Sequence, residues 1–217
     1  TPRGAIVRTC LQNFISEHLT RQGYHQVYTP HIGKLDLYRT SGHFPYYQES
    51  QYPPLVEKDM MAKLASEGCT CGDLSNMMAT GDIEGYMLKP MNCPHHIKIY
   101  ASQGRSYRDL PLRLAEFGTV YRWEQSGEIS GLTRVRGFTQ DDAHIFCMNS
   151  QITSECVKFC ELLQQIYKDF GFAELKVKFS DRPLIRAGED TTWDKAEKAL
   201  IVAIEAAGIS YTLNPGE

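Results

Sequence analysis

The segment Arg134-Val-Arg-Gly-Phe-Thr-Gln-Asp-Asp-Ala-His144 carries most of the information about the architecture of this chain. It lies in the second of two long strand-like stretches, which cover residues 112–124 and 133–147. The polar segment between them, residues 125–132, contains glycine and is typical of a wide hairpin loop. We therefore expect an antiparallel hairpin within a β-sheet.

Helical and strand patterns surround this hairpin. Apolar residues recur at helical spacing over about residues 4–22 and 151–170, and Thr191 or Thr192 can cap a further helix that ends at Ala207. Alternating or short apolar runs predict strands at residues 24–29, 86–89, 175–179 and 209–213. The mixture predicts an α+β fold in which helices flank an antiparallel β-sheet.

A turn-rich stretch of glycines and prolines separates the first strand from the second. It covers residues 41–85 and has a single helical pattern, at about residues 56–66. Loops this long in a compact domain are often functional. We interpret residues 48–85 as a long insertion on the core.

The composition is that of an ordinary globular protein. The chain has 217 residues, 42% of them hydrophobic, and 23 basic against 26 acidic residues give a net charge of −3. This balance argues against a general nucleic-acid coat, which needs a basic excess. The seven cysteines are scattered, which favours reduced intracellular thiols over a disulfide framework. No apolar run approaches the roughly 18 residues of a membrane span.

Alternation along the second hairpin strand places chemically active side chains on one face. The even positions from 134 to 144 and two residues of the preceding strand share this character: Arg134, Arg136, Phe138, Gln140, Asp142, His144, Arg122 and Glu124. Arginine forks bind phosphate oxygens and an aromatic ring stacks on a base. A carboxylate can accept from an exocyclic amine or hold an ammonium group. The row suits a nucleotide at one end and a small zwitterion at the other. Taken one by one, these residues fit a solvated sheet face with cross-strand salt bridges equally well.

Five runs of sequence connect the chain to a known family. They are Thr40-Ser-Gly-His43, Lys89-Pro-Met-Asn-Cys-Pro94, Ser106-Tyr-Arg-Asp-Leu-Pro111, Arg113-Leu-Ala-Glu-Phe-Gly118 and Arg134 through Cys147. With these runs the chain closely resembles the catalytic core of the threonyl-tRNA synthetases, which are class II aminoacyl-tRNA synthetases. The resemblance extends over nearly the whole chain.

The resemblance implies a domain organisation. Residues 1–217 correspond to a partial class II catalytic domain, with motif 1 at about 4–30, the insertion at about 48–85 and motif 2 at about 113–147. No run that resembles motif 3 occurs before Glu217. We therefore expect a core truncated before motif 3, without the editing and anticodon-binding domains, and inactive alone.

The resemblance also implies a role for each residue of the row. The catalytic residues would be Arg122 and Arg134, and the ATP-binding residues Arg122, Glu124, Arg134 and Phe138. The threonine-binding residues would be Cys93, Gln140, Asp142 and His144. Cys93 and His144 would also be two of three ligands of a Zn²⁺ ion, with the third ligand outside this chain. Thiolate and imidazole are donors that zinc favours, and a zinc that binds a hydroxyl rejects an isostere lacking it.

The implied activity is that of a threonine–tRNA ligase. ATP with Mg²⁺ would activate threonine to threonyl-adenylate, and the threonyl group would pass to tRNA(Thr). The intact protein would be a cytoplasmic homodimer that binds no membrane. Two alternatives stay open: another class II synthetase, such as the prolyl or seryl enzyme, and a non-catalytic synthetase-like protein that binds an amino acid or RNA.

Overall fold

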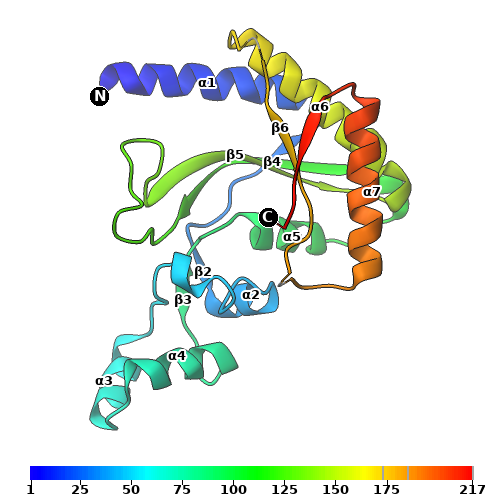
Figure 1. Ribbon diagram of the computed structural model, residues 1–217. Helices are drawn as coiled ribbons and strands as arrows, with labels where there is room; N and C mark the ends of the chain where they lie inside the picture. Colours follow the sequence, from blue (N-terminus) through cyan, green and yellow to red (C-terminus); the bar gives the residue numbers. More distant parts are fainter. Residues whose placement is uncertain (173, 185, 217) are drawn as a thin grey trace. The chain divides into compact units, whose positions relative to one another are not determined.

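The computed structural model describes residues 1–172, 174–184 and 186–216, except for the side chains at positions 71 and 75 (Figure 1). The chain divides into two compact units. Unit 1 contains residues 1–24, 105–113 and 145–217, and unit 2 contains residues 25–104 and 114–144.

Unit 1 is built on three long helices, α1 (Pro2–Arg21), α6 (Ile152–Asp169) and α7 (Asp190–Ala206). Strands β6 (Val177–Ser180) and β7 (Tyr211–Asn214) pair in parallel, because α7 connects them as the crossover helix of a βαβ unit. Single turns of 3₁₀ helix, η2 (Tyr107–Asp109) and η3 (Asn149–Gln151), complete the unit. The three predicted helices are thus present within one or two residues of their expected ends.

Apolar contacts and a partly buried ion pair stabilise unit 1. Phe14 of α1 packs against Phe170 with ring centroids 5.1 Å apart. The guanidinium of Arg113 donates to both carboxylate oxygens of Glu155 of α6, at 2.6 and 2.7 Å. This bidentate geometry is the strong form of the arginine–carboxylate pair.

Unit 2 contains two sheets, drawn mainly in blue and green in Figure 1. One has the order β1 (His25–Gln26), β4 (Leu112–Tyr121), β5 (Gly137–Phe146). The other pairs β2 (Ile32–Lys34) with β3 (Tyr86–Leu88). The ends of β4 and β5 distal to the hairpin loop belong to unit 1. The helices of unit 2 are α2 (Leu35–Thr40), η1 (Gln48–Ser50), α3 (Lys58–Ser66), α4 (Cys71–Thr80) and α5 (Cys93–Ala101).

The predicted hairpin is present, with shorter strands than expected. The backbone N–H of Arg122 donates to the carbonyl of Arg136 at 2.9 Å, and the Thr119 and Thr139 hydroxyls are 3.1 Å apart. One strand advances three residues while the other recedes three, as in an antiparallel pair. β4 ends at Tyr121 and β5 begins at Gly137, so both arginines lie beyond the strands.

The fold class is confirmed as α+β, but the sheets are mixed rather than wholly antiparallel. β1 pairs in parallel with β4, at His25 with Leu114 and Gln26 with Ala115. A parallel pair needs a long connection, and nearly ninety residues separate these strands along the chain. At the start of α7 the N-cap residue is Glu189, without a side-chain cap, and not either of the predicted threonines.

The stretch interpreted as an insertion shares a hydrophobic core with its surroundings. Leu64 of α3, Met78 of α4 and Ile83 are buried in one cluster together with residues that flank the stretch, namely Leu35, Tyr38, Phe44 and Met87. The single predicted helix is α3; α4, which the sequence reading missed, is a second one. The stretch is therefore a folded part of unit 2 rather than a plain loop.

Two negative observations complete the description. Across the described residues, no helix combines the length and the apolar character that crossing a bilayer requires. The cysteines whose side chains are described are free, at positions 10, 69, 93, 147, 156 and 160.

Candidate functional site

Strand β5 carries four of the predicted site residues on one face. Phe138, Gln140, Asp142 and His144 alternate along it and are half-buried, while Asp141 between them is exposed. The sequence predicted six residues in a row on this strand, at the even positions from 134 to 144. Arg134 and Arg136 instead precede the strand and lie in the hairpin connection, so four of the six are on it. These six residues, together with Arg122 and Glu124, all belong to unit 2.

One end of the site is cationic and aromatic. The guanidinium carbon of Arg122 lies 5.3 Å from the centroid of the Phe138 ring. A guanidinium over a ring face is a cation–π contact, and the same flat pair can accept a planar base or a phosphate.

Two further arginines surround Glu124. This carboxylate is buried and accepts from Arg134 Nε at 3.0 Å, so the structure pairs two residues that were predicted to bind ATP separately. Arg136 donates to the Glu124 backbone carbonyl at 3.1 Å and lies 4.7 Å from the centroid of the Trp123 ring. Arg134 and Glu124 therefore form a salt bridge, as the alternative interpretation of these residues predicted, but within the hairpin connection rather than across the strands.

The other end holds a thiol, an imidazole and a carboxylate. Cys93 is the first residue of α5. Burial and the nearby Asp142 carboxylate raise the pKa of its thiol. Burial lowers the pKa of His144, as does the neighbouring His96, and the same Asp142 opposes this. Asp142 therefore acts electrostatically on both predicted metal ligands.

Asp142 is itself held by a residue from the turn before α5. Asn92 is fully buried, and its Nδ2 donates to Asp142 Oδ2 at 2.8 Å. The side chain fits only because position 118 in β4 is glycine: a Cβ there would lie 2.3 Å from Asn92 Oδ1. Gly118 thus makes room for the amide that orients Asp142.

A buried charged network lies next to this end. The Glu116 carboxylate of β4 is 5% exposed and accepts from Thr29 N at 2.8 Å, from Lys89 Nζ at 3.3 Å and from His96 Nε2 at 3.1 Å. Burial alone would raise the pKa of Glu116, but the hydrogen bonds from His96 and Thr29 and the Lys89 charge lower it to about 2. From His96 the network reaches His144, since their Nδ1 atoms are 2.9 Å apart.

The sequence analysis predicts no role for these supporting residues, although they lie in or next to the segments that carry the family resemblance. The sequence contains a signal for them. Lys89 and Asn92 flank Pro90 and Met91, and Glu116 is a charged residue among the apolar residues Leu114, Ala115 and Phe117 of β4. A charged residue within a buried strand needs partners, and alternation cannot say which ones.

The donor chemistry at Cys93 and His144 suits zinc, since thiolate and imidazole are its usual ligands. Among the described residues no group of three or more His, Cys, Asp or Glu side chains is placed to hold a metal ion. Cys93 and His144 have the donor chemistry of two zinc ligands, and no third donor is placed with them among the described residues.

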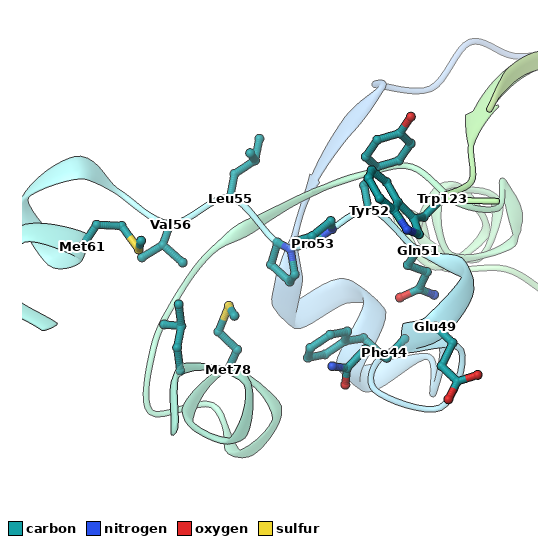
Figure 2. Close-up of a pocket in the computed structure, with 13 residues that line it drawn as sticks. Phe44, Glu49, Gln51, Tyr52, Pro53, Leu55, Val56, Met61, Met78 and Trp123 are labelled. Carbon is teal, nitrogen blue, oxygen red and sulfur yellow. The ribbon is translucent and has the colours of Figure 1, made fainter. Parts of the chain in front are cut away.

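A separate apolar pocket of about 620 Å³ lies elsewhere in unit 2. Figure 2 shows Val56 and Met61 at one end and the Tyr52 and Trp123 rings at the other. The Tyr52 and Trp123 rings meet edge to face with centroids 5.3 Å apart. Gln51 is a polar side chain in its wall, and its Nε2 donates to the His43 carbonyl at 2.9 Å. Trp123 lines this pocket and lies between Arg122 and Glu124 in the chain, so it is shared between the pocket wall and the segment that contains the candidate residues.

Comparison with known proteins adds three findings. The family model "tRNA synthetase class II core domain (G, H, P, S and T)" matches residues 79–211. A threonine–tRNA ligase of Deinococcus radiodurans is 48% identical over 219 residues, which cover 100% of this chain and 30% of that protein. A crystal structure described as the RNA binding domain of threonyl-tRNA synthetase from Cryptosporidium parvum has a TM-score of 0.80 at 35% identity, covering 100% of this chain and 48% of that one.

A second solved structure is similar to this chain over nearly its whole length. A putative threonyl-tRNA synthetase from Aeropyrum pernix has a TM-score of 0.73 and 29% identity, covering 97% of this chain and 44% of that one. The chain spans about 30% of the length of the curated relatives it matches. From the family match and these similarities, the chain belongs to the class II tRNA synthetase core domain family (G, H, P, S and T), and its whole length aligns with part of the threonine–tRNA ligases.

Proposed function

We propose that the protein to which this chain belongs is a threonine–tRNA ligase. It would use ATP with Mg²⁺ to convert threonine to threonyl-adenylate and then transfer the threonyl group to tRNA(Thr). The observation that carries the proposal is the arrangement along one face of β5. Phe138 lies beside the Arg122 guanidinium at one end, and Asp142 and His144 lie at the other end, where Asp142 acts on the Cys93 thiol.

At the first end the chemistry is positioning and charge stabilisation. Arg122 would hold the α-phosphate while the threonine carboxylate attacks its phosphorus, the bond to the β-phosphate breaks and pyrophosphate leaves. Phe138 would stack on the adenine. When ATP binds, the salt bridge between Arg134 and Glu124 would open. Arg134 would then bind ATP phosphate oxygens, and Glu124 would accept a hydrogen bond from the adenine amine. The nucleophile is the threonine carboxylate, so no side chain has to act as one. The protein contributes positioning and preorganised donors, which lower the barrier electrostatically.

At the second end Asp142 and Gln140 would bind the threonine, with Asp142 facing its ammonium group. Cys93 and His144 would be two ligands of a zinc ion. When bound, that ion would recognise both the amine and the hydroxyl of threonine and so exclude valine. Serine has the same two groups, so this site alone separates threonine from serine poorly.

Other parts of the proposal come from the resemblance. Residues of about 4–30 would contribute to a homodimer interface, and the protein would act in the cytoplasm.

The test is threonine-dependent ATP–pyrophosphate exchange by the full-length protein that contains this chain. Arg122→Ala should lower the exchange rate about 100- to 1,000-fold, because a phosphate-binding donor is lost. Arg122→Lys keeps the charge but not the bidentate fork and should restore only part of it. Lys176→Ala, at an exposed position, serves as the control. Normal exchange by Arg122→Ala would reject the assigned role.

The same assay separates the proposal from the other class II synthetases. Exchange should depend on threonine and should not be supported by proline. A proline-dependent signal, or one that serine supports better than threonine, would favour the prolyl or seryl enzyme.

A further inference from the structure

One buried imidazole has no part in the proposed reaction. His96 of α5 is fully buried, and both of its ring nitrogens are engaged. Its Nε2 lies 3.1 Å from Glu116 Oε2, and its Nδ1 lies 2.9 Å from Nδ1 of His144. The two imidazole planes are nearly perpendicular, at 81°.

The hydrogen bonds fix which nitrogens carry protons. An ionised carboxylate only accepts, so Nε2 of His96 must be the protonated nitrogen that donates to Glu116. In a neutral ring the other nitrogen, Nδ1, is then an acceptor. The partner across the 2.9 Å contact, Nδ1 of His144, must therefore carry a proton and donate it.

The negative charge of Glu116 is matched without His96. Its carboxylate is paired with the Lys89 ammonium at 3.3 Å, and both side chains are buried. The donor and acceptor roles given above are those of the neutral imidazoles.

We propose that His96, held by Glu116, is a positioning residue that fixes the Nδ1-protonated tautomer of His144. This tautomer leaves the lone pair of His144 Nε2 bare, in the form that a metal ion requires of an imidazole ligand. The role of this lone pair as a metal donor rests on the proposed function. The tautomer itself is a property of the chain.

The tautomer can be read without metal or substrate. In the chain labelled with ¹⁵N-histidine, NMR correlations from ring protons to ring nitrogens distinguish a protonated nitrogen from a bare one. Measured where both rings are neutral, Nδ1 of His144 and Nε2 of His96 should be protonated, and Nε2 of His144 bare. A proton on Nε2 of His144 would overturn the proposal.

Two substitutions of His96 separate its two contacts. His96→Asn keeps a carboxamide near the position of Nδ1 and can still accept from His144. His96→Gln keeps a donor near the position of Nε2 for Glu116 but offers no acceptor to His144. The Nδ1-protonated tautomer of His144 should therefore remain dominant in the Asn variant. In the Gln variant the ratio of the Nδ1-protonated to the Nε2-protonated tautomer should fall about five- to tenfold, as expected for one lost hydrogen bond.

His95→Gln is the matched control, because His95 is the neighbouring buried residue and its Nε2 contacts the Tyr38 hydroxyl at 3.0 Å instead. It should leave the tautomer of His144 unchanged. Equal tautomer ratios in all three variants would contradict the role of His96. The wild-type spectrum decides the question even where a variant does not fold.

Failure of this inference is distinguishable from failure of the proposed function. The wrong tautomer with intact threonine-dependent exchange by the full-length protein rejects only the positioning role. The predicted tautomer without any exchange rejects the ligase proposal and leaves the positioning role of His96 supported.

Discussion

At the scale of single residues, the contact between Gly118 and Asn92 is the tightest constraint near the site. A Cβ at position 118 would lie 2.3 Å from Oδ1 and 2.5 Å from Nδ2 of Asn92. These distances are far below van der Waals contact, and both residues are buried in a packed core. Either the backbone of β4 or the amide that holds Asp142 would have to move.

We therefore expect Gly118→Ala to destabilise unit 2 by about 1–3 kcal/mol, the usual effect of overpacking a core. Unfolding in urea, followed through hydrogen exchange of the β4 amides, measures the change. Gly104→Ala is the control, because a Cβ there meets nothing within 4 Å. Adding Asn92→Ala to Gly118→Ala should recover part of the loss; an additive double variant would contradict the contact.

The buried Glu116 makes stability depend on pH in the acid range. Its pKa is lowered from 4.5 to about 2 in the folded state, so the stabilisation is complete above pH 4.5 and disappears as the pH falls toward 2. A shift of this size corresponds to about 3 kcal/mol. Unfolding free energies measured between pH 6 and pH 2 should therefore decrease over that interval, apart from the contributions of other carboxylates.

Glu116→Gln should reduce that decrease in the acid range. It should also lower stability at neutral pH, because it leaves the Lys89 ammonium buried without its carboxylate. Glu67→Gln, at an exposed position on the same unit, should leave the pH profile unchanged. Identical profiles for Glu116→Gln and the wild type would show that Glu116 is not the group responsible.

The residue scale also shows how far sequence reasoning reached. Alternation placed Phe138, Asp142 and His144 on one face, as observed, since a strand of this length fixes the parity of its side chains. It did not reveal that Asn92 contacts Asp142 or that Glu116 contacts His96. Those contacts join residues 50 and 20 positions apart, and only the register of the folded chain brings them together.

At the scale of elements, α4 depends on a local signal at its first turn. The Thr70 hydroxyl accepts from Asp73 N at 3.2 Å, and the Asp73 carboxylate accepts from Thr70 N at 3.0 Å, which together form a capping box. These bonds satisfy backbone donors that the helix cannot satisfy itself.

Thr70→Ala should therefore destabilise α4 by about 1 kcal/mol. Hydrogen exchange of the amides in residues 71–80 measures the loss of protection, and the amides of α5 serve as the internal reference. Thr70→Ser retains the hydroxyl and should behave nearly as the wild type. Equal protection in the Ala and Ser variants would show that the box contributes nothing.

The long helices α1 and α6 were predicted from the sequence, whereas the short elements α2 and β2 were not. α1 and α6 show many turns of apolar periodicity, and their boundaries were predicted within about two residues. α2 has only six residues and no side-chain cap, so its sequence contains too little periodicity to recognise. β2 has three residues and depends on its pairing with β3, which is distant in sequence.

At the scale of the whole molecule, the chain covers a limited part of its relatives. It spans about 30% of the length of the curated threonine–tRNA ligases it matches. The family was predicted correctly from the sequence, because the segments that carry the resemblance are long. The division into two units, each assembled from separate segments, could not be read from it.

We expect a polypeptide of residues 1–217 to give no threonine-dependent ATP–pyrophosphate exchange above background. The matched full-length protein should give a clear signal under the same conditions. A circular dichroism spectrum of the short polypeptide with the helix content of the structure would establish that it is folded. Measurable exchange by the folded short polypeptide would overturn the expectation.

The contact of Asn92 with Gly118 has a consequence for how such sequences can vary. The two positions are 26 residues apart in the chain, yet position 118 cannot gain a side chain while the Asn92 amide stays in place. A lineage that acquires a side chain at position 118 must shorten the one at position 92, and Asp142 then needs a new donor. Drift at these three positions should therefore be joint, so that the substitutions are inherited as a set rather than one at a time.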